Sequence, residues 1–265
     1  MRTQLMNQIQ RAAQQQFDRQ SDRYGQGHIL SDVSDVQDAL RRLVWLKPGR
    51  ALDVATGAGH TGLCLAGAGW QVTLADISTA MLERAATTAR ERGLHVETRQ
   101  HAAESFPYAE DKFDLVTCRV AAHHFSDPAA FVRETARVLK PDGALLLIDG
   151  SIEDVQPVAE EWIHAIEKLR DPSHHRFLTQ RNWIRLSEEA GLSVAFCELQ
   201  PFKQPDLNWY FDTAGTTPEN RAKVLELVSH APPEARNLFR LGEQDGKIVW
   251  WWQRLVLAAR KSANH

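Results

Sequence analysis

The sequence predicts an α/β fold built on a doubly wound sheet of about seven strands, with the last strand antiparallel. Residues 50–149 alternate short apolar runs with helical patterns, which is typical of repeated strand–helix units around a parallel sheet. A glycine-rich turn separates the first apolar run from the first helical pattern. Two further strand patterns, 193–199 and 247–259, follow without this alternation, so we expect an antiparallel pair to finish the same sheet.

The segment 1–48 predicts a helical cap in front of the sheet. Its apolar side chains from Leu5 to Phe17 fall at helical spacing, which favours an amphipathic helix. The segment 49–150 is then predicted to be the cofactor-binding core, in which each expected helix lies between two expected strands. We expect strands at 51–55, 71–75, 95–99, 113–118 and 143–149, and helices at 60–68, 79–92 and 128–139.

The segment 151–265 is predicted to complete the sheet, so the chain is expected to form a single domain over 1–265. Helical patterns at 157–170 and 180–190 come first, and the two final strands follow. Between these strands lies a polar, proline-bearing insertion at 201–246. It contains helical patterns at 218–229 and 232–239, and we interpret it as a cover over the substrate.

Composition and charge exclude several classes of protein. Lys and Arg total 31 against 34 Asp and Glu, and a net charge of -3 leaves no electrostatic footprint for nucleic acid or an anionic membrane. The longest aliphatic run, 144–148, is far too short to span a bilayer. Cys64, Cys118 and Cys197 form no CxxC pair, so neither a disulfide framework nor a structural zinc site is indicated. We expect a soluble, cytoplasmic monomer or homodimer without nucleic-acid partners or stable membrane insertion.

The residues after the first predicted strand carry the strongest functional signal. Gly57 and Gly59 allow a tight turn that a ligand can approach closely, and the following helix offers free N–H groups. Asp76 ends the second predicted strand, where a carboxylate can accept hydrogen bonds from ribose hydroxyls. The pattern Gly57-x-Gly59-x-x-Gly62 also matches the dinucleotide fingerprint, which keeps an NAD-binding oxidoreductase as an alternative. Against NAD, Asp53 just before the turn would repel a pyrophosphate and attract an ammonium group.

Four segments of the predicted core resemble the motifs of class I S-adenosylmethionine-dependent methyltransferases. They are Leu52–Thr61 (LDVATGAGHT), Ala75–Leu82 (ADISTAML), Phe113–Arg119 (FDLVTCR) and Leu139–Asp149 (LKPDGALLLID). Within this family the sequence is most similar to small-molecule methyltransferases resembling those of ubiquinone and menaquinone biosynthesis. The resemblance implies a Rossmann-like fold, S-adenosyl-L-methionine as cofactor and methyl transfer to a small-molecule acceptor.

The resemblance also implies a set of cofactor-binding residues. These are Tyr24, Asp53, Gly57, Gly59, Asp76, Ile77, Met81, Ala103, Glu104 and Arg119. The two glycines would pack against the methionine part of the cofactor, with Asp53 near its amino group. Asp76 would hold the ribose, and Arg119 would face the methionine end. Tyr24 would either fold over the cofactor or pack with a satisfied hydroxyl.

Adenine recognition departs from the family pattern at one position. Ile77 and Met81 would flank the adenine, and Ala103 and Glu104 would lie at its edge. Family members commonly carry an aspartate where this sequence has Ala102, and one lost hydrogen bond costs about 0.5–1.5 kcal/mol. We therefore expect backbone groups, Glu104 or water to bind the adenine edge.

Methyl transfer from a sulfonium is an in-line displacement, in which the nucleophile is held close to the methyl group. A general base is required only if that nucleophile carries a proton at neutral pH. His123 and His124, just after the fourth predicted strand, are the candidate catalytic bases. The alternative is a structural role, such as capping the helix at Pro128. A second pair, His174 and His175, could border the substrate pocket; neither pair has metal-ligand spacing, so no metal site is expected.

Three hypotheses about function follow from these patterns. The leading one is S-adenosylmethionine-dependent methyl transfer to a small-molecule acceptor. The first alternative is an NAD-binding Rossmann oxidoreductase. The second is a non-catalytic cofactor-binding protein of the same fold, for which Ala102 is the hint.

Overall fold

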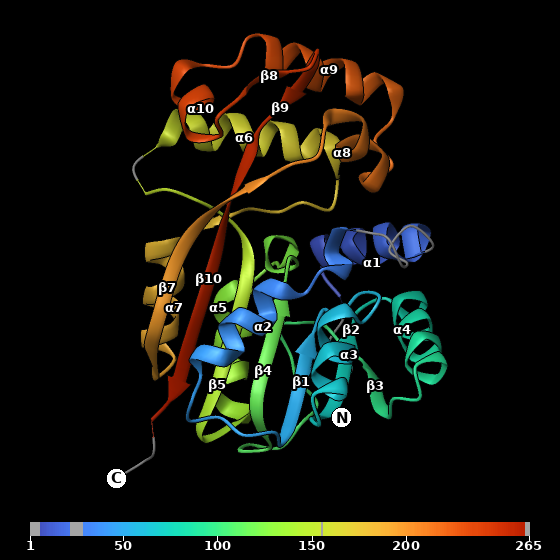
Figure 1. The fold of residues 1–265 in the computed structure, drawn as a ribbon, viewed down its shortest axis with the longest axis vertical. Coiled ribbons are helices and arrows are strands. Elements are labelled where there is room, and N and C mark those ends of the chain that lie inside the picture. Colours follow the sequence, from blue (N-terminus) through green and yellow to red (C-terminus); the bar gives the residue numbers. More distant parts are fainter. Residues whose placement is uncertain (1–5, 22–28, 155, 263–265) are drawn as a thin grey trace.

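The computed structural model describes residues 6–21, 29–154 and 156–262. An α/β core surrounds a twisted sheet, and a smaller helical layer covers one end of that sheet (Figure 1). The first elements are α1 (Gln8–Gln20), α2 (Ser34–Arg42), β1 (Arg50–Val54), α3 (His60–Gly67), β2 (Gln71–Asp76), α4 (Thr79–Glu91), β3 (Val96–Gln100), β4 (Phe113–Arg119), α5 (Pro128–Val138) and β5 (Leu139–Ile152). The later ones are α6 (Pro157–Arg170), β6 (Leu178–Thr179), α7 (Gln180–Glu189), β7 (Leu192–Lys203), α8 (Leu207–Ala214), α9 (Pro218–Ser229), α10 (Pro233–Leu238), β8 (Gly242–Gln244), β9 (Lys247–Val249) and β10 (Trp251–Lys261).

The main sheet has the order β3-β2-β1-β4-β5-β10-β7, and β6 pairs with the end of β5. Strands β1 to β5 are parallel, whereas β10 is antiparallel to both of its neighbours, β5 and β7. The strand order reverses between β1 and β4, and such a reversal leaves a ligand-binding crevice at the carboxyl ends of parallel strands. The predicted α/β fold with an antiparallel last strand is confirmed.

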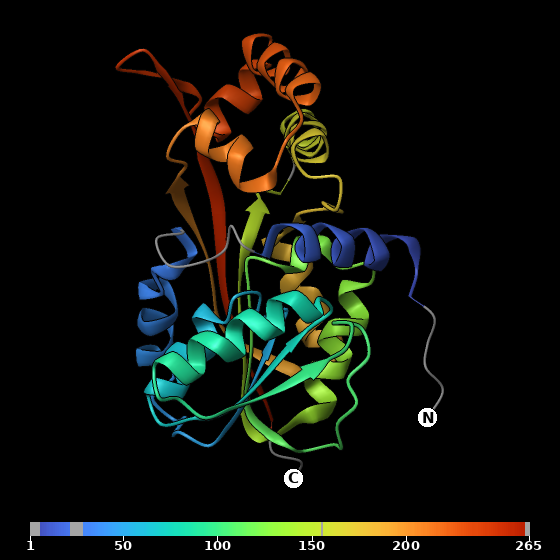
Figure 2. The same cartoon turned by 90° about the vertical axis from the view of Figure 1, so that its right-hand side faces the viewer.

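Helices cover both faces of the sheet, so each central strand buries side chains in two directions (Figure 2). In β5, Leu145 and Leu147 belong to the apolar layer formed with α5 and α7. Leu146 and Ile148 alternate with them and belong to the layer formed with α2, α3 and α4. This double burial explains the almost unbroken aliphatic run in the sequence of β5.

Helix starts next to the crevice follow capping signals in the sequence. The Ser78 hydroxyl accepts a hydrogen bond from the backbone N–H of Met81 at the start of α4, at 3.1 Å. Asp127 caps α5 in the same way through the N–H of Ala130, at 2.9 Å. Each cap costs roughly 1 kcal/mol to remove. Because these helices begin soon after β2 and β4, the connecting loops are held at the carboxyl ends of the strands.

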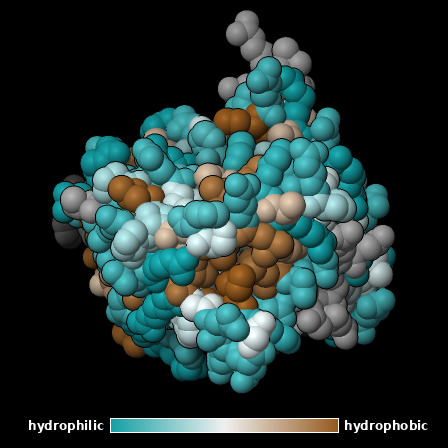
Figure 3. All heavy atoms as spheres, turned by 90° about the horizontal axis from the view of Figure 1, so that it is seen from above, coloured by the Kyte–Doolittle hydropathy of each residue, from teal (hydrophilic) through white to brown (hydrophobic). Residues whose placement is uncertain are grey.

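The insertion predicted at 201–246 differs in detail from the observed structure. Strand β7 continues to Lys203, and the unpredicted helix α8 follows it. Helices α9 and α10 lie at the predicted positions. Together with α6, these helices form an apolar cluster of their own around Trp162, Tyr210 and Phe239. Seen from above, this layer is mainly hydrophilic, with apolar side chains gathered near the middle (Figure 3).

The predicted strand 247–259 is two strands in the structure. Its first residues, as β9, pair with β8 in a hairpin, and only β10 joins the main sheet. Asp245 and Gly246 both have positive φ, 52° and 71°, the backbone that a tight two-residue turn requires. The Asp-Gly dipeptide is therefore the sequence signal that marks this hairpin.

No helix in the ranges that the structure describes is long and apolar enough to cross a membrane. All three cysteines are free thiols.

Trp250 and Trp252 pack on the apolar cluster of the helical layer, whereas Trp251 lies beneath the Lys203 ammonium, 5.4 Å from the ring centre. Trp250 and Trp252 thus join the start of β10 to the layer above it.

Candidate active site

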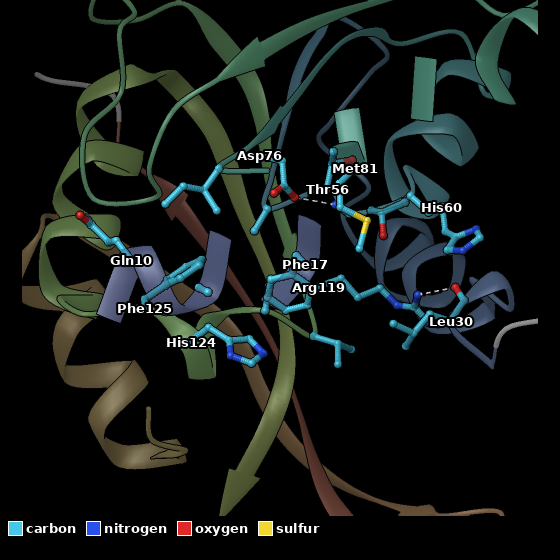
Figure 4. Close-up of a pocket in the computed structure, with 18 of the residues that line it drawn as sticks. Gln10, Phe17, Leu30, Thr56, His60, Asp76, Met81, Arg119, His124 and Phe125 are labelled. Atoms are coloured by element: carbon cyan, nitrogen blue, oxygen red, sulfur yellow. Dashed lines mark hydrogen bonds between the residues drawn. The ribbon is translucent and has the colours of Figure 1, made fainter. Parts of the chain in front are cut away.

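A first pocket opens at the carboxyl ends of β1, β2 and β4, with α1 across its mouth (Figures 2 and 4). We call it the glycine-loop pocket. It is lined by Gln10, Ala13, Phe17, Leu30, Ala55, Thr56, Gly57, Ala58, His60, Thr61, Asp76, Ile77, Met81, Glu104, Arg119, Val120, Ala121, His124 and Phe125. This is where the strand order predicts a ligand site.

The two glycines of the loop have different roles. Gly57 has a φ of +54°, and a Cβ at this position would meet nothing within 4 Å, so its backbone borders open space. Gly59 has a φ of +86°, and its Cβ would lie 2.9 Å from the Cβ of Ala85 in α4. Both positions need the conformational freedom of glycine. Only Gly57 lines the pocket, while Gly59 allows close packing of the loop on α4.

Asp53 lies beneath the loop and not among the residues that line the pocket. Its carboxylate accepts hydrogen bonds from the Thr56 hydroxyl at 2.5 Å, the Gly62 N–H at 3.0 Å and the Thr117 hydroxyl at 2.6 Å. Complete burial raises the pKa of Asp53, and these donors act in the opposite direction. The contacts tie the end of β1 to the loop and to the start of α3.

Asp76 lines the pocket at the end of β2, where the sequence places it. One carboxylate oxygen accepts the Gly57 N–H at 2.8 Å and the other accepts the Ser78 N–H at 2.9 Å. Burial raises the pKa of Asp76 to about 6, against the lowering effect of these hydrogen bonds. Ile77 and Met81 line the same wall, so a carboxylate and two apolar side chains face one ligand space.

The loop after β3 contributes Glu104 but not Ala103. Glu104 lines the pocket and accepts hydrogen bonds from Gln10 Nε2 at 2.8 Å and from the Ser126 hydroxyl at 2.7 Å. Ala103 is buried in the apolar layer below. The carbonyl of Ala102 is within hydrogen-bond distance of His101 Nδ1, at 2.8 Å. Glu104 is therefore the acidic group that this loop presents to the pocket.

Arg119 lines the pocket with its stem, but its guanidinium binds the N-terminal segment (Figure 4). It donates to Asp35 at 3.0 Å, to the Leu30 carbonyl at 2.8 Å and to the Asp32 carbonyl at 2.6 Å. The Arg119 side chain is 6% exposed and the Asp35 side chain 9%, so this ion pair is shielded from water. Arg119 thus fixes the segment before α2 against the end of β4. The candidate Tyr24 lies outside the described residues.

A second pocket adjoins the first and reaches under the helical layer. We call it the aromatic pocket; it is lined by Phe17, Ile29, Leu30, Val120, His123, His124, Gly150, Arg170, Asp171, Phe202, Gln204, Trp209, Thr213, Trp252 and Arg254. Phe17, Leu30, Val120 and His124 line both pockets. The ring of Phe17 meets that of His124 edge to face, with centroids 5.0 Å apart.

The adjacent candidates His123 and His124 have opposite electrostatic surroundings. His123 Nδ1 lies 2.7 Å from the Asp149 carboxylate. Burial alone would lower the pKa of His123, but the ion pair with Asp149 outweighs it and the pKa is raised. Burial and the neighbouring charge of His123 lower the pKa of His124 to about 4. At neutral pH His124 is therefore a neutral imidazole between the two pockets.

His124 is connected to a carboxylate that sequence reasoning missed. Its Nδ1 lies 3.1 Å from the Ser173 hydroxyl, which donates to Asp171 at 2.6 Å. If Ser173 donates to Asp171, it accepts from the Nδ1–H of His124 and leaves Nε2 unprotonated. No local motif predicts the contact of Ser173 and Asp171 with His124, because their loop follows α6 and lies far from His124 in sequence.

The second histidine pair does not line either pocket. His174 is 1% exposed, and neither of its ring nitrogens has a hydrogen-bond partner among the described residues. His175 is exposed, and its backbone N–H donates to the His123 carbonyl at 2.9 Å. Within the described ranges no group of three or more His, Cys, Asp or Glu side chains is arranged to hold a metal ion.

The fold and the loop together define a Rossmann-like α/β protein whose sheet is finished by antiparallel strands. Residues 52–147 match a family model described as a methyltransferase domain. The chain is 34% identical to the uncharacterised methyltransferase YcgJ of Bacillus subtilis over 244 residues, 91% of this chain and 95% of that protein. The crystal structure of YcgJ superposes with a TM-score of 0.77 at 31% identity, covering 86% of this chain and 100% of that one.

Two further relatives extend the comparison. The uncharacterised protein YafE of Escherichia coli is 41% identical over 173 residues, 64% of this chain and 82% of that protein. The ubiquinone/menaquinone biosynthesis C-methyltransferase UbiE of Serratia proteamaculans is 30% identical over 145 residues, 49% of this chain and 58% of that enzyme. This chain belongs to the class I S-adenosylmethionine-dependent methyltransferases. Its glycine fingerprint is thus that of a methyltransferase and not of an NAD-binding oxidoreductase.

Proposed function

We propose that the chain binds S-adenosyl-L-methionine in the glycine-loop pocket and transfers its methyl group to a small molecule held in the aromatic pocket. The observation that carries this proposal is the shared wall, in which His124 borders both pockets. A donor and an acceptor bound on either side of one wall meet at a defined point, which is what an in-line displacement requires. The aromatic pocket is a concave site lined by aromatic and apolar side chains with a few charged groups, which suits a small molecule and not a macromolecule.

The residues of the glycine-loop pocket fit a nucleoside that carries an amino acid. Gly57 leaves open space where a side chain would block the ligand, and Asp76 lines that space with a carboxylate for ribose hydroxyls. Ile77 and Met81 supply apolar contacts for a flat base. Asp53 supports this proposal indirectly, since it holds the loop from below. S-adenosylmethionine would supply an electrophilic methyl group on its sulfonium.

We assign the general base to His124 rather than His123. With a pKa of about 4, His124 is unprotonated at neutral pH and can accept a proton from the acceptor. The Ser173 hydroxyl, itself bonded to Asp171, holds the ring through Nδ1 and leaves Nε2 to face the acceptor. His123 is paired with the Asp149 carboxylate, and we interpret it as a residue that helps to position His124.

Isothermal titration with S-adenosylhomocysteine tests the cofactor assignment. We expect saturable binding that is lost in Asp76→Ala and tighter than any binding of NADH. Absence of binding at millimolar S-adenosylhomocysteine would refute the assignment.

A second experiment tests turnover and the remaining non-catalytic alternative. A small-molecule extract is incubated with the protein and S-adenosylmethionine labelled in its methyl group, and products are identified by mass spectrometry. We expect a labelled small molecule that is absent with Asp76→Ala. Tight S-adenosylhomocysteine binding without any labelled product would favour a non-catalytic cofactor-binding protein. We also infer a cytoplasmic enzyme, consistent with its three free thiols, that acts as a monomer or homodimer.

A further inference from the structure

Arg254 occupies a place in the aromatic pocket that the proposed methyl transfer does not explain. It lies on β10 opposite Gly150 of β5 and Gln200 of the edge strand β7. Its guanidinium stacks on the Phe202 ring, 3.5 Å from the ring centre, and its side chain is 13% exposed. Stacking on a ring face leaves the edge of the guanidinium, where its N–H groups point, available to a ligand.

The charge of Arg254 is only partly neutralised by the protein. Its Nη1 donates to Asp35 at 3.0 Å, but Arg119 donates to the same carboxylate oxygen, also at 3.0 Å. One carboxylate therefore serves two buried guanidinium groups. Arg119 satisfies its other donors with backbone carbonyls, whereas Nε and Nη2 of Arg254 have no acceptor among the described residues. The nearby Asp32 carboxylate accepts the Ser34 N–H at 2.9 Å instead.

The other charged groups facing the aromatic pocket have their own partners. Arg170 pairs with Glu167 at 3.2 Å and donates to the Tyr210 carbonyl. Asp171 accepts from Ser173, which places this carboxylate at the His124 end of the pocket. His123 is paired with Asp149. An anionic ligand group would therefore be repelled at the His124 end and attracted to Arg254.

A second residue that lines this pocket carries a buried donor without an acceptor. The indole Nε1 of Trp252, two residues before Arg254 on the same strand, is buried without a hydrogen-bond partner among the described residues. Leaving a buried donor unpaired is costly. Phe202 and Trp209 add apolar and aromatic surface beside these donors.

We propose that the methyl acceptor carries a carboxylate on an apolar, planar body, and that this carboxylate binds Arg254 while the nucleophile faces His124. This inference rests on the proposed function, because it concerns the substrate of the same site. A carboxylate matches the guanidinium edge with two oxygens and supplies the missing negative charge. Arg254 then acts as a specificity-determining residue that turns the acceptor toward the methyl donor.

The test begins with the labelled-methyl assay on an extract separated by anion exchange at neutral pH. We expect the labelled acceptor in the retained, anionic fraction. The Michaelis constant for this acceptor should rise at least tenfold in Arg254→Gln and recover in part in Arg254→Lys. Arg260→Gln, on the same strand but outside both pockets, serves as the matched control and should leave that constant unchanged. Affinity for S-adenosylhomocysteine should stay within about twofold in all three variants.

The outcomes separate the two proposals. An acceptor found in the unretained fraction, or a Michaelis constant unaffected by Arg254→Gln, would overturn the anionic acceptor and leave methyl transfer standing. Labelling in no fraction, with S-adenosylhomocysteine still bound, would overturn the proposed function and this inference with it. The fractionation step uses the unaltered protein, so it decides the question even if an Arg254 variant does not fold.

Discussion

The two pockets are built in different ways, although they share a wall. The glycine-loop pocket takes its ligand-facing groups mainly from the ends of β1, β2 and β4 and the loops directly after them. The aromatic pocket is assembled from Phe17, the residues after β4, the end of α6, β7, α8 and β10. A pocket made by a short local motif is fixed by backbone conformation. A pocket made by distant segments depends on how the whole sheet and the helical layer are packed.

The first prediction tests whether backbone conformation fixes the glycine-loop pocket. Gly57→Val adds a β-branched side chain where φ is +54° and where a Cβ would enter the open pocket. We expect the affinity for S-adenosylhomocysteine, measured by titration calorimetry, to fall by about 1000-fold, or about 4 kcal/mol. Gly67→Ala is the control, since its Cβ also meets nothing within 4 Å but lies outside the pocket. Unchanged affinity in Gly57→Val would remove this loop from the cofactor site.

The second prediction separates chemistry from cofactor binding at the shared wall. His124→Ala removes the proposed base, so kcat should fall by about 100-fold for an acceptor that carries a proton on its nucleophile. Cofactor affinity should change by less than about threefold, because His124 only borders the glycine-loop pocket. The exposed His175→Ala is the matched control in steady-state assays. An equal loss of cofactor binding in His124→Ala would make the residue structural.

The same difference between pockets explains what the sequence could predict. Gly57 and Asp76 follow strand ends in a recognisable order, so their position at the crevice follows from topology alone. Arg119 was expected at the methionine end, yet its guanidinium binds Asp35 and two carbonyls of the N-terminal segment. No local pattern encodes that contact, because its partners lie in the N-terminal segment 1–48, which precedes the predicted core.

The residues of the aromatic pocket show more clearly what sequence patterns cannot predict. Arg254 reaches this pocket from β10, which lies between β5 and β7, and Asp171 reaches it from the loop after α6. Sequence periodicity predicts the strands involved but not their order, so it cannot say which side chains converge. The Asp-Gly hairpin before β9 is the opposite case, since a two-residue signal is sufficient to mark it.

The third prediction concerns the pH dependence of stability in the ligand-free protein. The pKa of Asp76 is raised from 3.8 to about 6, so the folded protein holds a proton that the unfolded chain releases between these values. The free energy of unfolding should therefore fall as pH rises from about 4 to about 6, by roughly 2–3 kcal/mol at most from this group. Urea denaturation of Asp76→Asn across this range should show a correspondingly flatter profile. The exposed Asp38→Asn should retain the slope, and an identical slope in Asp76→Asn would contradict the assignment.

The smallest predicted effect belongs to the hydroxyl that links His124 to Asp171. Ser173→Ala removes one hydrogen bond on each side, and a bond of about 0.5–1.5 kcal/mol corresponds to a roughly twofold to tenfold loss of kcat. Cofactor affinity should not change, because Ser173 lines neither pocket.

A pH profile distinguishes this positioning role from simple loss of packing. The charge of Asp171 raises the pKa of His124 against burial, so Asp171→Asn should move the acidic limb of kcat to lower pH, below the limb expected near pH 4. Ser173→Ala leaves that charge in place and should lower the plateau while moving the limb little. Loss of activity in both variants without any movement of the limb in Asp171→Asn would show that the loop only packs against His124. The pKa of His124 would then be set without the charge of Asp171.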